Sequence, residues 1–155
     1  MKLYLAQHGA AVPKAEDPTR PLSEQGSRDV GAVASLLRLA GVRVERVWHS
    51  GKLRAEQTAR LLAGAVLPRG RKMQAIEGIG PTAAVADFSA DADVWEEDTL
   101  VVGHLPFMAR LVALLTTGDS ECNIVDYHPG SVVCLERADG GRWVVCWMIR
   151  PDMLP

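Results

Sequence analysis

The chain has 155 residues, of which 48% are hydrophobic and 23% are charged, with a formal net charge of -2. This composition is typical of one globular domain over residues 1–155, long enough to bury a core, and it lacks the basic footprint of a nucleic-acid-binding protein. No apolar run approaches the about 20 residues of a membrane span, so we expect neither nucleic acid nor membrane as a partner. The spacing of Cys122, Cys134 and Cys146 is not that of metal ligands and indicates buried thiols in a reducing compartment, hence a cytoplasmic location.

The first predicted strand, residues 2–6, leads directly into Gln7-His8-Gly9. A short apolar run that meets a glycine is typical of a buried strand ending in a tight loop. Ligands of open α/β sheets lie outside the carboxyl ends of the strands, so His8 is expected to face a site. The proline-rich residues 10–21 favour a loop standing over that site.

A helix follows over residues 24–40, with Ser23 as the predicted N-cap and Gly41 as the stop. The alternating residues 42–48 predict a second strand, parallel to the first through a right-handed crossover. Ser50 is then the predicted N-cap of a helix that carries Arg54 in its first turn. Free backbone N–H groups favour an anion there, and a guanidinium adds a bidentate fork. The alternative for Arg54 is an exposed helix arginine without a role.

The rest of the chain continues the alternation of strands and helices. Glu77 follows a short strand and places a carboxylate on the functional side of the sheet. A hairpin turn at residues 139–141 predicts that the last two strands are antiparallel to each other. The tail over residues 150–155 is expected to add no element. The remaining elements are expected at residues 73–76 (strand), 83–88 (helix), 99–102 (strand), 106–115 (helix), 131–137 (strand) and 142–149 (strand).

A second junction of a strand with a histidine occurs at Gly103-His104. If His8, Arg54 and His104 converge, an imidazole can act as a nucleophile, and phosphorus is the electrophile that best fits an arginine at a helix N-terminus. A neutral His8 would attack in line, while Arg54 and a protonated His104 hold the equatorial oxygens. Glu77 is the nearest candidate acid by position, and an ordinary loop carboxylate is an equally good interpretation.

Other phosphate chemistries fit the sequence less well. No glycine-rich loop with a following Lys-Ser or Lys-Thr is present, and no arginine closely follows Cys122. Asp91 and Asp93 do not follow a strand, as an aspartyl nucleophile would. The four histidines, His8, His49, His104 and His128, lack ligand spacing, so no metal is expected. For His128 a surface loop position is favoured over one at the rim of the site.

Four motifs in this order resemble those of the histidine phosphatase superfamily, which includes the phosphoglycerate mutases. They are a strand followed by His8-Gly9, Pro-Leu-Ser-Glu-Gln-Gly at residues 21–26, Ser-x-x-x-Arg-Ala-x-Gln-Thr at residues 50–58, and Val-Gly-His-x-Pro at residues 102–106. The short length and the ending Trp-Met-Ile-Arg-Pro at residues 147–151 are most similar to small bacterial SixA-type phosphohistidine phosphatases. The resemblance implies a three-layer helix–sheet–helix α/β fold of the phosphoglycerate mutase type, with a mostly parallel sheet.

The resemblance also implies roles for individual residues. It makes His8 the nucleophile and Arg54 and His104 phosphate ligands, and it requires no metal or organic cofactor. Gln7 and Gly9, on either side of His8, are further candidate phosphate-binding residues. Members of this type lack the large lid insertions of the mutases, so the resemblance implies a phosphohistidine-bearing protein as substrate, in signal transduction. A related small phosphoester is the other substrate class.

One position departs from the family motif Arg-His-Gly, since this chain has Gln7 before His8. The Gln7 amide still donates a hydrogen bond but carries no charge. Losing one oxyanion donor typically costs about 10²–10³ in rate, against a total acceleration of at least roughly 10⁶. We therefore expect a working but impaired catalyst. The alternative is a non-catalytic phosphate-binding module, and Lys14 or Arg20 are candidates to replace the missing charge.

Overall fold

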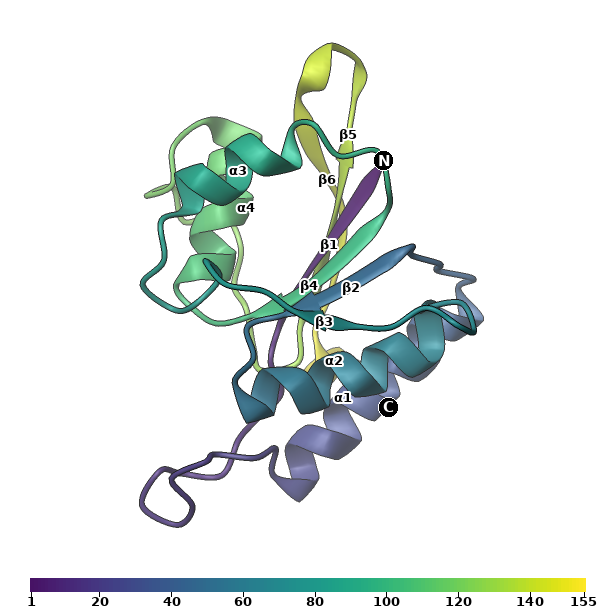
Figure 1. The fold of residues 1–155 in the computed structure, drawn as a ribbon, viewed down its shortest axis with the longest axis vertical. Helices are drawn as coiled ribbons and strands as arrows, with labels where there is room; N and C mark the ends of the chain where they lie inside the picture. Colours follow the sequence, from purple (N-terminus) through teal and green to yellow (C-terminus); the bar gives the residue numbers. More distant parts are fainter.

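The computed structural model describes residues 1–155 as a six-stranded sheet in the order β3-β2-β4-β1-β5-β6 (Figure 1). The strands are β1 (Lys2–Gln7), β2 (Arg46–His49), β3 (Gln74–Ala75), β4 (Thr99–Gly103), β5 (Val132–Arg137) and β6 (Trp143–Ile149). The helices are α1 (Glu24–Leu39), α2 (Leu53–Val66), α3 (Val85–Ala92) and α4 (Phe107–Thr117), with short 3₁₀ turns η1 (Asp139–Gly141) and η2 (Pro151–Met153).

Strands β1 to β4 are parallel, and β5 and β6 form the antiparallel end of the sheet. This confirms the expected mostly parallel sheet with an antiparallel C-terminal hairpin. Strands β1 and β2 run parallel as predicted, but β4 lies between them and pairs with both. The arrangement brings the carboxyl ends of β1 and β4 side by side.

Helices cover both faces of the sheet, α1 and α2 on one side and α3 and α4 on the other (Figure 1). The alternate residues of β1 divide between two cores, with Tyr4 and Ala6 in a cluster of 16 buried residues and Leu3 and Leu5 in a cluster of 15. A strand covered on both faces has no polar side, which explains the unbroken apolar run at the start of the chain. The three-layer architecture is thus confirmed.

Helix α1 begins and ends as the sequence predicts. The Ser23 hydroxyl accepts a hydrogen bond from the Gly26 amide at 3.0 Å, and Gly41 follows the helix with a φ of +71°. A Cβ at Gly26 would lie 2.1 Å from the carbonyl oxygen of Ala10. Glycine is therefore required where the first turn of α1 touches the loop that follows His8.

Several predicted boundaries are wrong. Strand β2 begins at Arg46, because the Val44 amide bonds to the Val66 carbonyl at the end of α2 and not to a neighbouring strand. The alternation before Arg46 reflects packing against α2. Helix α3 begins and ends later than expected, and the tail contains the η2 turn, from which Leu154 packs back on the core.

The N-cap of α2 is also corrected, because Lys52 takes that position without a side-chain hydrogen bond. Of the three free cysteines only Cys134 is buried, while Cys122 is partly exposed and Cys146 exposed. The edge position of β6 explains the exposure of Cys146. None of the helices has the length and apolar character needed to cross a membrane.

Candidate active site

The two predicted junctions of a strand with a histidine meet at one edge of the sheet. Gln7 at the end of β1 is in register with Gly103 at the end of β4, and the His8 amide donates to the Gly103 carbonyl at 3.0 Å. The rings of His8 and His104 consequently lie with their centroids 4.9 Å apart and their planes at 55°. The convergence expected from the sequence is present in the structure.

The hydrogen bonds of His8 define which of its nitrogens is free to react. Its Nδ1 lies 2.7 Å from the Gly9 carbonyl oxygen, which can only accept, so Nδ1 carries the proton. The Arg54 Nε donates to Nε2 of the same ring at 3.2 Å, so Nε2 presents its lone pair. Burial lowers the pKa of His8, and the positive charge of Arg54 adds to this effect. His8 is a neutral imidazole with its Nε2 lone pair directed at a guanidinium.

Thr58 connects the His8 loop to the helix that carries Arg54. Its hydroxyl donates to the Arg54 carbonyl at 2.7 Å, one turn earlier in α2, and accepts from the Gly9 amide at 3.0 Å. Both polar groups of Gly9 are therefore in use within the protein. The sequence indicates only that Thr58 faces inward. A signal for the contact with the Arg54 carbonyl was available, because a helix threonine commonly bonds to the carbonyl four residues before it.

His104 is only 2% exposed, and its environment disfavours a charge. Its Nε2 lies 2.6 Å from the Ser50 hydroxyl, and its Nδ1 is buried without a hydrogen-bond partner. Burial is the main cause that lowers the pKa of His104 to about 3, with further contributions from the neighbouring His8 ring and the positive charge of Arg54. The protein environment of His104 therefore favours the neutral ring over the protonated one expected from the sequence. The role of Ser50 as a partner of His104, in place of a helix cap, is a second feature that the sequence did not indicate.

Gln7 lies beside this centre with one polar atom unsatisfied. The residue is 8% exposed, its backbone N–H donates to the Ser131 carbonyl at 3.0 Å, and its side-chain Oε1 is buried without a partner. An uncharged side chain thus occupies the position where the family motif has an arginine. Arg54 is the guanidinium bonded to the His8 ring.

The other candidate residues, Glu77 and His128, make no hydrogen bond to His8, Arg54 or His104. Glu77 is exposed in the loop after β3 and makes no hydrogen bond or ion pair. His128 is half-exposed between the carboxylates of Asp126 and Asp152, each at 3.5 Å. Nearby, the Gly130 amide donates to the His8 carbonyl at 3.1 Å, so this loop supports the site through its backbone. No group of three or more potential metal-ligating side chains is present.

Comparison with known proteins places this geometry in a family. No protein-family model matches the chain. The chain is 32% identical over 145 residues to the phosphohistidine phosphatase SixA of Escherichia coli strain K12, covering 90% of this chain and 89% of the relative. It is 33% identical over 127 residues to an uncharacterised protein of Picosynechococcus, covering 77% and 76% of the two chains.

Among solved structures, the protein histidine phosphatase SixA complexed with tungstate superposes with a TM-score of 0.86 and 27% identity, covering 99% of both chains. The likeness therefore extends over the whole sheet and all four helices. The sequence match is long enough to show common descent as well as a common fold. This chain belongs to the SixA-type phosphatases of the histidine phosphatase superfamily.

Proposed function

We propose that this phosphatase removes the phosphoryl group from phosphohistidine on proteins through a covalent phospho-His8 intermediate. The observation that supports this most directly is the pair of hydrogen bonds on the His8 ring. The Gly9 carbonyl holds the proton on Nδ1, so the lone pair of Nε2 points toward Arg54. A neutral nucleophile directed at a guanidinium is the arrangement that in-line attack on a bound phosphoryl group requires.

The proposed reaction has two steps that balance. In the first, the lone pair of His8 Nε2 forms a bond to phosphorus while the bond from phosphorus to the substrate nitrogen breaks, and the substrate imidazole leaves with that electron pair. In the second, water attacks phosphorus while the bond to His8 breaks, the electron pair of that bond returns to Nε2, and both protons of the water leave on the product as dihydrogen phosphate. An imidazole protonated on its other nitrogen leaves without further help, whereas an alcohol needs a proton. For such an ester, Glu77 is the proposed acid.

Arg54 and His104 are the proposed ligands of the phosphoryl oxygens. The guanidinium of Arg54 is free to exchange its contact with His8 for phosphoryl oxygens once substrate arrives. A dianion beside His104 would offset the positive charges that now lower its pKa, so the ring would take up a proton as negative charge develops. A related SixA has been solved with tungstate, a tetrahedral oxyanion that resembles phosphate, which supports this assignment.

A protein-borne substrate is proposed because no cavity of the structure encloses the nucleophile. None of the cavities in the structure is lined by His8, Arg54 or His104. His8 is partly exposed at the end of β1. A phosphorylated side chain on another protein can approach such a site without a lid opening. A cytoplasmic location remains the prediction made from the sequence.

Rapid-quench labelling tests the intermediate. A protein carrying ³²P-phosphohistidine is mixed with the enzyme, and label on the enzyme is measured within milliseconds. We expect acid-labile label on the wild type and none on His8→Ala. The matched control is His128→Ala, which removes an exposed histidine and should label like the wild type. Absence of both label and phosphate release in the wild type would contradict the proposal.

A non-catalytic phosphate-binding module is the second candidate function, and Gln7 is the observation that favours it. Without the charge of an arginine at this position, binding can persist while turnover is lost. Such a module would bind vanadate or tungstate with no phosphate release, and Gln7→Arg would then raise activity sharply. Turnover by the wild type rules this alternative out.

A further inference from the structure

The phosphate site lacks the positive charge that an arginine at position 7 would supply. A phosphoryl group carries close to two negative charges, and Arg54 is the guanidinium in contact with the His8 ring. Two cations, Lys14 and Arg20, lie on the loop between β1 and α1. The structure distinguishes between them.

Arg20 is held in a strained backbone conformation. It is the non-glycine residue of the chain with a positive φ, at 49°. L-residues avoid this left-handed region, and such strain is found most often at functional sites, where the surrounding structure maintains it. Two hydrogen bonds hold the backbone on either side of Arg20. The Val12 amide donates to the Pro21 carbonyl at 2.8 Å, and the Leu22 amide donates to Gln57 Oε1 at 2.7 Å.

The guanidinium of Arg20 is only partly used within the protein. Its Nε donates to the Val12 carbonyl at 3.2 Å, whereas neither Nη group has a hydrogen bond or a carboxylate partner. One bond on Nε orients the guanidinium and leaves its outer donors free for a ligand. An arginine held through Nε in this way can donate hydrogen bonds from its Nη groups to an oxyanion.

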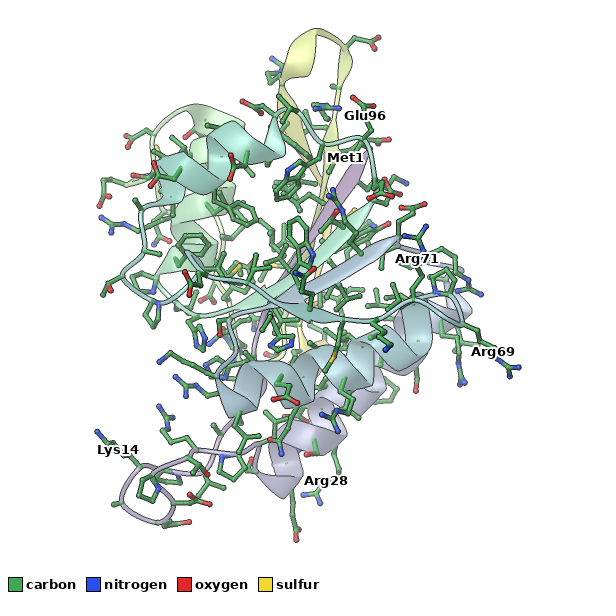
Figure 2. All side chains as sticks on the ribbon, in the orientation of Figure 1. Met1, Lys14, Arg28, Arg69, Arg71 and Glu96 are labelled. Carbon is green, nitrogen blue, oxygen red and sulfur yellow. The ribbon has the colours of Figure 1, made fainter.

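Arg20 lies on the part of the loop that contacts the helix of Arg54, because the Leu22 amide bonds to Gln57 in α2. The positive charge of Arg20 contributes to the lowered pKa of His8, Arg54 and His104 alike, and Lys14 contributes to none of them. Figure 2 shows Lys14 at the far end of the loop, pointing away from the sheet. Arg20 follows the turn that brings the chain back toward α1.

We propose that Arg20 is the second guanidinium of the phosphate site, donating through its Nη groups to phosphoryl oxygens in place of the arginine that Gln7 replaces. The ligand class is a tetrahedral dianion, either a phosphoryl group or its analogues. This inference rests on the proposed function for the identity of the ligand. Its test includes tungstate binding, which does not require turnover.

A double-mutant cycle between positions 7 and 20 tests the replacement. Removing one oxyanion donor typically costs about 100-fold or more, so Arg20→Gln is expected to lower kcat/KM about 100-fold in the wild-type background. In the Gln7→Arg background, Arg20→Gln should lower kcat/KM less than about tenfold, because the introduced guanidinium also donates to the phosphoryl oxygens. The matched control Lys14→Gln should change kcat/KM less than about twofold. Equal losses from Arg20→Gln in the two backgrounds would overturn the proposal.

Tungstate affinity measured by calorimetry separates binding from folding and from catalysis. Arg20→Gly removes the side chain while favouring the left-handed backbone, so it should keep or raise the melting temperature and weaken tungstate binding about tenfold or more. Unchanged tungstate affinity in Arg20→Gly would reject the role of Arg20, whatever the wild type does with substrate. If the wild type binds tungstate through Arg20 but releases no phosphate, the proposed function fails and the assignment of Arg20 stands.

Discussion

Acidification should destabilise the protein through His104, because this ring is buried as a neutral imidazole. The pKa of His104 falls from 6.5 in the unfolded chain to about 3 in the folded protein. The unfolded state then binds a proton between these values that the folded state cannot bind. The contribution of His104 to the free energy of unfolding is therefore constant above pH 6.5 and falls by about 1.4 kcal/mol per pH unit below it. From pH 7 to pH 5, His104 alone should lower the free energy of unfolding by about 2 kcal/mol.

Urea denaturation at pH 7 and pH 5 measures this effect directly. His8 and the carboxylates also titrate, so the informative quantity is the difference between wild type and His104→Asn. The variant should lose about 2 kcal/mol less than the wild type over this range. The same pH response in wild type and His104→Asn would refute a neutral buried His104.

The same histidine should link anion binding to proton uptake. A dianion beside the ring favours its charged form, so tungstate binding should raise the pKa of His104. Calorimetry at pH 6.5 in buffers of different ionisation enthalpy should then show up to one proton taken up per anion bound. His104→Asn should take up less. Binding without uptake in the wild type would mean that the ring donates to the anion in its neutral form.

Three further predictions concern the residues around the two histidines. Ser50→Ala removes the hydroxyl 2.6 Å from His104 Nε2 and should lower kcat about tenfold in steady-state assays without changing the melting temperature. Thr58→Val removes two buried hydrogen bonds and should lower the free energy of unfolding by about 1–3 kcal/mol in urea, whereas Thr58→Ser should lose less. Because burial lowers the pKa of His8, the unprotonated nucleophile persists below pH 6.5, and a profile of kcat/KM against pH should fall only at more acidic values.

The parts of the site that the sequence predicts depend on local pattern and on the geometry of parallel strands. Apolar runs identify β1 and β4, and parallel strands present their carboxyl ends at one edge, so His8 and His104 were expected to meet. Arg54 was expected there because it falls in the first turn of a helix that follows a strand. Each of these inferences uses residues that are neighbours in the chain and a general rule of sheet topology.

The parts that the sequence does not predict depend on how distant elements align. Ser50 has the residue type and position of a helix cap, and only the pairing of β2 with β4 brings its hydroxyl to His104. Likewise the bond from Gly9 to Thr58 depends on how α2 lies against the loop after β1. The start of β2 was misplaced because alternation alone does not distinguish a strand from a segment packed on a helix end.

The charges of the protein groups around the site explain how Gln7 can be tolerated next to the nucleophile. The charged groups that perturb His8, Arg54 and His104 are all cationic, and no carboxylate is among them. Positive charge that no acidic side chain neutralises raises the affinity for an oxyanion, but it also costs stability through mutual repulsion. A further arginine at position 7 would add to that repulsion in a largely buried position, whereas an amide does not. If Arg20 supplies the second guanidinium from an open loop, the site keeps two cationic donors for the anion while only one of them is fixed beside the buried histidines.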